Sequence, residues 1–169
     1  VILINNWYFV TNKLFFDFDK ENDIERARKD AVVVIDRLIA DGVNPNNIQC
    51  AFSGSKGFSV EVEHSALLNP QQFKNLVFSY ASDLTTFDTV VNDPNRIIRV
   101  TGTKHPKSGL YKFPLTVEQM QNLNVEDIKV LAQDINNAAE DYSGWTPVTL
   151  PTVALGRAHR ETKSETKVV

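Results

Sequence analysis

The chain has 169 residues, 42% of them hydrophobic and 23% charged, which is typical of a globular domain. No apolar run approaches the roughly 18 residues of a membrane-spanning helix. The single cysteine, Cys50, excludes an internal disulfide and a zinc site built on several cysteines. The lone cysteine and the lack of a signal peptide favour a reducing, cytoplasmic compartment. Because the chain does not begin with Met, we expect it to be a segment excised from a longer protein.

The first half of the chain predicts four strands and one helix. The expected strands cover residues 7–10, 13–19, 48–52 and 58–62, with a turn at residues 11–12. The helix is expected over residues 24–40, because its apolar residues recur at helical spacing. Asn22 or Asp23 can cap the start of this helix, and Gly42 is expected to end it.

The second half predicts further helices and a basic hairpin. A helix is expected from Asn69-Pro70 to about residue 81. Strands are expected over residues 96–100 and 111–115, on either side of a Lys-Ser-Gly turn. A short helix follows Thr116, which forms a capping box with Gln119, and an amphipathic helix is expected over residues 125–140. We expect one mixed α/β domain over residues 1–142, followed by a partly disordered extension over residues 143–169.

Two acidic residues lie in an otherwise apolar strand, Phe15-Phe16-Asp17-Phe18-Asp19. Residues two apart share a face of a strand, so Asp17 and Asp19 project side by side. Paired carboxylates repel unless a cation lies between them, and their oxygens suit Mg²⁺ or Mn²⁺. The alternative is a strand that ends in acids and caps the next helix. The surrounding apolar residues favour the metal site, because acids in a buried strand require a reason.

A polar, glycine-containing loop separates two predicted strands at residues 53–59. Gly54 and Gly57 permit a tight backbone with exposed N–H groups, and Ser53 and Lys56 add donors, so the loop suits a phosphate. It lacks the spacing and the Lys-Ser/Thr ending of a P-loop. Taken alone, a plain β-turn with polar residues is the favoured interpretation.

The segment from Pro94 to Val117 contains no acid, although the whole chain has a net charge of −3. It holds five of the chain's 18 basic residues and one histidine, His105, in a turn flanked by Pro and Gly. The five basic residues are Arg96, Arg99, Lys104, Lys107 and Lys112. Such a local imbalance predicts an anion-binding site, and the alternative is a solvated, charged hairpin.

Four motifs occur in an order that resembles the archaeo-eukaryotic primase superfamily, the small catalytic primase subunits and the primase-polymerases of plasmids, phages and mobile elements. The family pattern is a hydrophobic DxD strand, an SGxxGxH element, a hydrophobic-Asp pair, and an R-hh-R run followed by S/T-x-H-x-KTG. Here the motifs read Phe16-Asp17-Phe18-Asp19, residues 53–59, Phe87-Asp88, and residues 96–99 with 103–109. The resemblance covers about residues 7–115.

The resemblance implies a DNA primase or primase-polymerase with an RRM-like sheet flanked by helices. Two divalent metals, Mg²⁺ or Mn²⁺, are expected on Asp17, Asp19 and Asp88, the last chosen over Asp93 from the order of the motifs. The triphosphate is expected to contact Ser53, Lys56, Ser59, Arg99 and His105. Template DNA is expected to contact Arg96, Lys104, Lys107 and Lys112. The implied partners are single-stranded DNA, nucleoside triphosphates, and a helicase or larger primase subunit, in trans or in a longer parent chain.

One position departs from the family pattern, because Ser59 stands where the second motif ends in histidine. A serine can donate a hydrogen bond but cannot carry charge. The departure motivates one alternative, a degenerate module that binds nucleotide or DNA without activity. A haloacid-dehalogenase phosphatase is a second, although Glu21 stands where that class has Thr or Val. A DxD glycosyltransferase is a weaker third.

Overall fold

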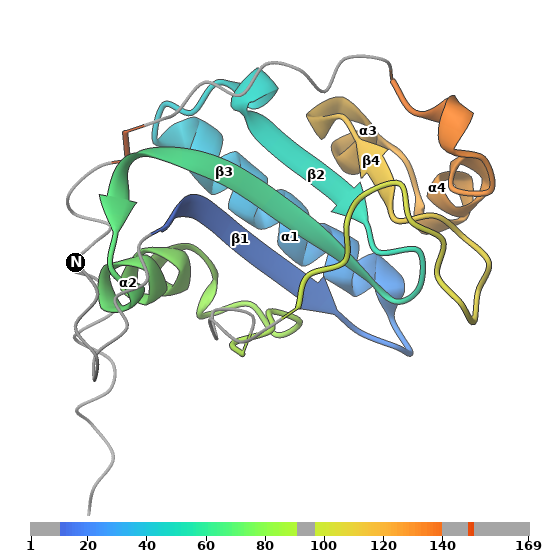
Figure 1. The fold of residues 1–169 in the computed structure, drawn as a ribbon, viewed down its shortest axis with the longest axis horizontal. Helices are drawn as coiled ribbons and strands as arrows, with labels where there is room; N and C mark the ends of the chain where they lie inside the picture. The colour runs from blue at the N-terminus through green and yellow to red at the C-terminus, as the bar shows by residue number, and fades with distance from the viewer. Residues whose placement is uncertain (1–10, 91–96, 140–148, 151–169) are drawn as a thin grey trace, which may run out of the picture.

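The protein is a mixed α/β fold, seen in a computed structural model that describes residues 11–90, 97–139 and 149–150 (Figure 1). Its sheet has the strand order β1-β3-β2-β4, and every neighbouring pair is antiparallel. The strands are β1 Thr11–Asp19, β2 Ile48–Phe52, β3 Gly57–Leu68 and β4 Phe113–Leu115. The expected fold class, a sheet flanked by helices, is confirmed. Among the described residues, no helix is both long and apolar enough to cross a membrane.

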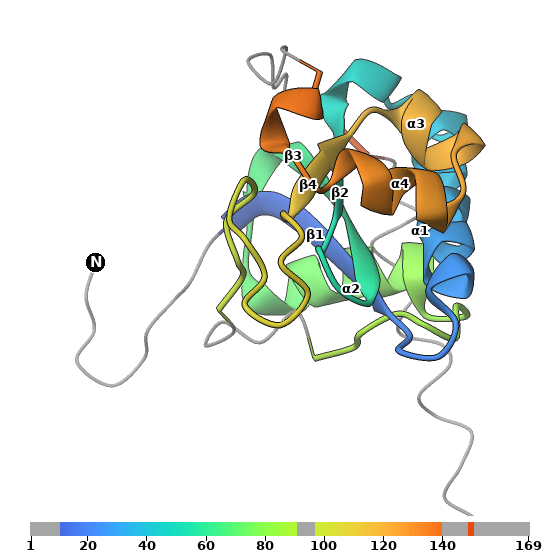
Figure 2. The same cartoon turned by 90° about the vertical axis from the view of Figure 1, so that its right-hand side faces the viewer.

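The two faces of the sheet differ because side chains alternate along each strand. On one face, Phe16, Phe18 and Phe58 are fully buried beneath α1 (Ile24–Ala40) and α2 (Pro70–Ala81). The edge of the Phe16 ring meets Tyr80 of α2, with ring centroids 6.2 Å apart. Figure 2 shows α1 on one side of the sheet and the segment 97–112 on the other. The second face therefore lies between the sheet and that basic segment.

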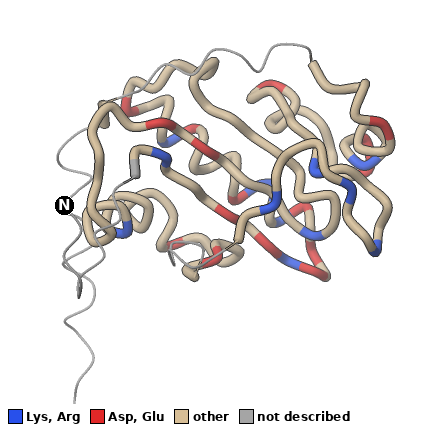
Figure 3. Tube along the Cα trace, in the orientation of Figure 1, with Lys and Arg blue, Asp and Glu red and all other residues tan. Residues whose placement is uncertain are grey.

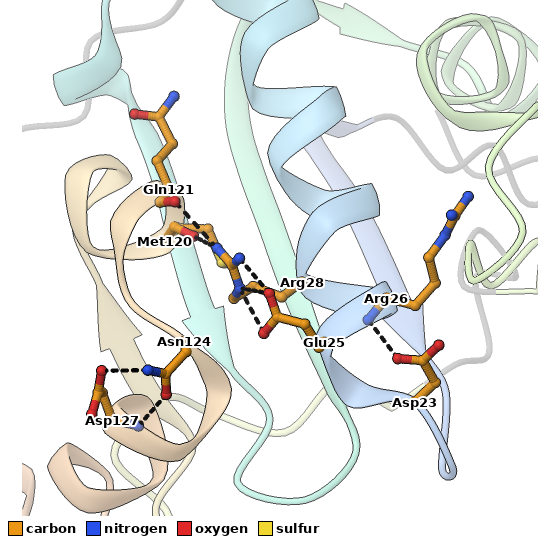
Figure 4. A network of polar contacts seen from close by, with 8 residues as sticks. All are labelled: Asp23, Glu25, Arg26, Arg28, Met120, Gln121, Asn124 and Asp127. Carbon is orange, nitrogen blue, oxygen red and sulfur yellow. Dashed lines mark hydrogen bonds and ion pairs between the residues drawn. The ribbon is translucent and has the colours of Figure 1, made fainter.

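Polar contacts hold the first two turns of helix α1 in place (Figure 4). Asp23 caps it by accepting a hydrogen bond from the backbone N–H of Arg26 at 3.0 Å, as predicted. The buried Arg28 donates through Nε to Glu25 and through Nη1 to the backbone carbonyls of Met120 and Gln121. Arg28 thus joins α1 to the end of α3 (Val117–Asn122), whose predicted capping box is present.

The helix predicted over residues 125–140 is wrong in its length. Helix α4 covers Val125–Leu131, and a separate 3-10 turn covers Ile135–Asn137. The carbonyl of Ala132 accepts a hydrogen bond from the backbone N–H of Tyr111 instead of continuing a helix. Asp134 then caps the 3-10 turn by accepting from the N–H of Asn136. A long-range contact and a cap therefore end a helix that its periodicity would extend.

Several other predicted elements differ from the structure or lie outside the described residues. Residues 11–12 do not form a turn but belong to β1, where a register shift against β3 lies between Thr11 and Lys13. The predicted strand at 96–100 is absent from residues 97–100, and the one at 111–115 is shortened to β4. A 3-10 turn covers Pro45–Asn47, directly before β2. The strand expected at 7–10 and most of the extension at 143–169 lie outside the described residues, although Leu150 is buried in the core.

Candidate active site

The face of the sheet opposite α1 carries a small cavity beneath the basic segment. In the register of the sheet, Asp17 of β1 pairs with Ser59 of β3, and Ser59 pairs with Ala51 of β2. Paired residues of antiparallel strands share a face, so this row points toward the segment 97–112. The cavity has a volume of about 110 Å³ and is lined by Phe15, Asp17, Ser53, Ser59, Ile97, Ile98, Arg99 and Lys112.

Residues 86–88 extend the sheet at the exposed end of β1. Phe87 forms an antiparallel bridge with Phe18, and their ring centroids are 5.9 Å apart on the core side. The N–H of Asp88 donates to the carbonyl of Asp17 at 2.8 Å, and the N–H of Asp19 donates to the carbonyl of Thr86 at 2.9 Å. Because Phe18 and Phe87 face the core, the neighbouring Asp17 and Asp88 occupy facing positions on the other side. The pairing brings an acid 69 residues from Asp19 to the same sheet face.

Asp19 occupies space that a side chain at position 57 would fill. Gly57 is its partner across the sheet, and a Cβ built there would lie 2.0 Å from the Oδ1 atom of Asp19 and 2.2 Å from the carbonyl oxygen of Phe18. Any larger residue would displace the carboxylate or the backbone of β1. The second glycine of the 53–59 motif is therefore required by the acidic motif beside it.

The three predicted metal ligands share a face but do not form a finished cluster. In the described part of the chain, no three His, Cys, Asp or Glu side chains lie close enough together to hold a metal ion as they stand. Oδ1 of Asp88 accepts a hydrogen bond from the N–H of Val90 at 2.9 Å. The donor chemistry and the shared face of Asp17, Asp19 and Asp88 fit a divalent cation such as Mg²⁺ or Mn²⁺. Metal binding by these residues stays a prediction.

The loop after β2 is closed by hydrogen bonds between its own residues. The Oγ atom of Ser53 accepts hydrogen bonds from the N–H groups of Ser55 and Gly57, at 3.2 and 3.0 Å. The expectation that these N–H groups are exposed for a phosphate is therefore wrong. The Ser53 hydroxyl borders the cavity and keeps its own proton to donate.

The same loop packs against the basic segment. Gly54 has a φ of +80°, and a Cβ there would lie 2.8 Å from the carbonyl oxygen of Tyr111. The hydroxyl of Ser108 donates to the carbonyl of Gly54. Segment 101–112 folds back on itself through a bridge between Lys104 and Tyr111, around the predicted turn. These contacts place the fourth motif against the loop of the second motif.

Two cations of the basic segment, Arg99 and Lys112, line the cavity. Figure 3 colours the basic and acidic positions along the chain trace. The Nη1 atom of Arg99 is buried and has no hydrogen-bond partner among the described residues. Lys112 is only 5% exposed, its Nζ atom donates to the carbonyl of Arg99 at 2.7 Å, and it lies 5.6 Å from the ring centre of Phe15. Burial lowers the pKa of both groups, and for Lys112 the charges of Glu61 and Asp17 oppose this effect. An orphaned guanidinium nitrogen beside a buried lysine suits an anion.

His105 lies next to this pair, in the turn of the basic segment. Its Nδ1 atom accepts weak hydrogen bonds from the N–H groups of Lys107 and Ser108, at 3.3 and 3.4 Å. Burial, followed by the charges of Arg99 and Lys107, lowers the pKa of His105. Because Nδ1 accepts, a neutral ring would carry its proton on Nε2, and His105 itself does not line the cavity.

The remaining predicted contacts are distributed over the outside of the site. Lys104 and Lys107 are exposed, and the ammonium group of Lys104 lies over the Tyr111 ring at 5.2 Å. Lys56 is exposed at the tip of its loop and does not line the cavity. Arg96 lies outside the described residues. Lys112, predicted to contact DNA, is instead buried at the cavity, a position better suited to a small anion than to a DNA backbone.

Three apolar residues of the cavity were not predicted from the sequence. Phe15 lies two residues before Asp17, so its strand position could have placed it on the same face. Ile97 and Ile98 border the cavity from the basic segment, and Ile97 is 94% exposed. An apolar rim beside charged groups fits a ligand that has both an apolar ring and anionic groups.

No protein-family model matches the chain, and no curated protein sequence matches it either. Among solved structures, the fold is similar to the polymerase domain of Mycobacterium tuberculosis ligase D, determined in complex with DNA. The TM-score is 0.48 and the sequence identity is 15%. The aligned region covers 73% of this chain and 52% of that chain, about half of its length. At this identity and TM-score the likeness carries nothing about function, which must be argued from the residues of the site.

Proposed function

We propose that the chain catalyses metal-dependent nucleotidyl transfer of the primase-polymerase type, in which a nucleoside triphosphate extends a primer or an initiating nucleotide on a single-stranded DNA template. One observation carries the proposal. Carboxylates of β1 and residues 86–88 share a sheet face with a cavity whose other side holds Arg99 and Lys112. In a metal–nucleotide complex, the metal cation would match the carboxylates, and the anionic phosphates would match Arg99 and Lys112.

In the proposed reaction, the 3′-hydroxyl gives its proton to solvent and its oxygen forms a bond to the α-phosphorus. The bond from that phosphorus to the bridging oxygen of the β-phosphate breaks, and pyrophosphate leaves. Asp17, Asp19 and Asp88 would hold Mg²⁺ or Mn²⁺, which when bound lowers the pKa of the attacking hydroxyl and neutralises charge on the phosphates. Arg99 would donate its unpartnered Nη1–H to a phosphate oxygen, and Lys112 would supply charge beside it. These residues would position the triphosphate and stabilise the charge that develops on it.

The exposed lysines of the basic segment would contact the template. Lys104 and Lys107 are exposed and do not line the cavity. Contacts to DNA phosphates release counterions, so template affinity should fall as salt rises. The two kinds of cation are separable, because exposed lysines should affect DNA binding and cavity residues should affect nucleotide binding.

A templated primer-extension assay with Mn²⁺ tests the proposal. The parent chain should add the nucleotide complementary to the template, and Asp88→Ala should abolish addition while leaving the melting temperature close to that of the parent. Asp127→Ala removes an exposed carboxylate on α4 and should retain full activity. Absence of extension by the parent, with or without Mn²⁺, would contradict the proposal.

The competing function is a module that binds nucleotide or DNA without reaction. The observation that favours it is Ser59, which lines the cavity where the resembled family has a histidine. Such a module would bind nucleotide in equilibrium dialysis and produce no extended primer in the same samples. Steady release of phosphate from a small phosphomonoester would instead indicate a phosphatase.

A further inference from the structure

We propose that Asp30 is a positioning residue, which acts through Thr86 to hold Asp88 on the same sheet face as Asp17 and Asp19. The proposal rests on the proposed function, because it concerns how the metal-binding carboxylates are placed. Asp30 belongs to α1 and is 56 residues from Thr86 in sequence. Neither residue belongs to the motifs of the resembled family.

The contact is buried and specific. The Oδ2 atom of Asp30 accepts hydrogen bonds from both the N–H and the hydroxyl of Thr86, at 3.1 and 2.8 Å. Its Oδ1 atom forms an ion pair with Nε of Arg26 at 3.0 Å. Asp30 is 2% exposed and Thr86 is 4% exposed. A buried carboxylate is costly unless it is well partnered, so this group holds Thr86 in one place.

Thr86 in turn determines how residues 86–88 pair with β1. Its carbonyl accepts from the N–H of Asp19, and two residues later the N–H of Asp88 donates to the carbonyl of Asp17. The side-chain period of a strand is two, so a slip of one residue would turn Asp88 toward the core. The paired segment is only three residues long, and its two backbone hydrogen bonds alone would fix its register against β1 only weakly. The anchor from α1 therefore supplies the register that the short pairing lacks.

The contact between Asp30 and Thr86 would orient a metal-binding carboxylate without binding the metal itself. Residues that orient ligands from behind typically change metal affinity about 10–100-fold when they are altered. Asp30 does not line the cavity, and its ion-pair partner Arg26 belongs to the same helix, α1. Its effect on metal should therefore be indirect and should not extend to the cations that hold the triphosphate.

The test compares Thr86→Val with Thr86→Ser in the full chain. Valine keeps the shape of threonine and removes the hydroxyl, whereas serine keeps the hydroxyl that Asp30 accepts. The matched control is Tyr80→Phe, which removes another hydroxyl–carboxylate hydrogen bond, to Asp41 at the far end of α1. Free Mn²⁺ is measured by electron paramagnetic resonance, exchange of the Asp88 amide by NMR, and stability by thermal melting.

Thr86→Val should weaken Mn²⁺ binding about 10-fold and speed exchange of the Asp88 amide, whereas Thr86→Ser should stay within about twofold of the parent. Tyr80→Phe should lower the melting temperature with unchanged Mn²⁺ affinity. Unchanged Mn²⁺ affinity in Thr86→Val, or an equal loss in Tyr80→Phe, overturns the positioning role. If the parent binds no Mn²⁺, the proposed function fails by itself, and the amide-exchange comparison still decides whether Thr86 sets the register.

Discussion

Restoring a histidine at position 59 should accelerate nucleotidyl transfer. Ser59 is 4% exposed, pairs with Asp17 across the sheet and lines the cavity together with Arg99. Ser59 alternates with Phe58 along β3, so its side chain lies on the face opposite the Phe58 ring. The cavity of about 110 Å³ can accept an imidazole, which adds about 60 Å³ at the packing density of a protein interior.

The size of the effect follows from the chemistry of a single preorganised donor. Removing such a donor typically costs about 10²–10³ in rate, equivalent to about 2.7–4 kcal/mol in the transition state. Ser59→His should therefore raise kcat by up to about 10²-fold. Mn²⁺ affinity should hardly change, because the new ring adds no ligand to Asp17, Asp19 or Asp88.

Single-nucleotide primer extension at saturating nucleotide measures the change in kcat. The matched control is Ser59→Phe, which fills the cavity with a ring of similar size that donates no hydrogen bond. Phenylalanine should lower kcat or raise the KM for nucleotide. A Ser59→His variant no faster than the parent, or a Ser59→Phe variant equally fast, would show that this pocket uses other donors for the triphosphate.

Three further predictions concern the same site. Gly57→Ala should destabilise the fold by about 1–3 kcal/mol and weaken Mn²⁺ binding, because its Cβ would clash with Asp19; Gly42→Ala, with open space but a φ of +93°, should lower only the melting temperature. Arg99→Ala should raise the KM for nucleotide about 10–100-fold with little change in DNA affinity. An unchanged KM together with weaker DNA binding in a filter-binding assay would show that Arg99 contacts DNA and not the nucleotide. The lowered pKa of His105 means that the folded chain binds fewer protons than the unfolded chain just below the ordinary pKa of histidine. Its unfolding free energy should therefore rise with pH in that window, and His105→Gln should remove that rise in denaturant titrations.

Local signals in the sequence were sufficient for the elements that carry the first two motifs. The apolar run around Asp17, the cap at Asp23 and the start at Asn69-Pro70 each act within a few residues, and the structure has β1, α1 and α2 where they indicate. Facing placement of Asp17 and Ser59 also follows from strand alternation once the register is known. These features depend on short-range chemistry and one long-range pairing.

The rest of the site depends on contacts that a local pattern does not encode. The segment 97–112 is held by hydrogen bonds such as Tyr111 to Ala132 and Lys112 to Arg99, so it follows the surface of the sheet instead of forming strands. The role of Asp30 left one signal in the sequence. It is an acid on the apolar stripe of a helix, three residues after the buried Ala27.

The charges of the cavity are arranged for a ligand more than for stability. Burial lowers the pKa of Arg99 and Lys112, so the folded chain stabilises their protonated forms less well than water does. A fold selected only for stability would gain by placing such groups in solvent, as it does Lys104 and Lys107. A bound polyanion would offset this cost in the cavity and not on the exposed lysines. Under the proposed function the nucleotide, and not the DNA, contacts Arg99 and Lys112. Nucleotide binding should therefore stabilise the chain against unfolding more than single-stranded DNA does at equal saturation.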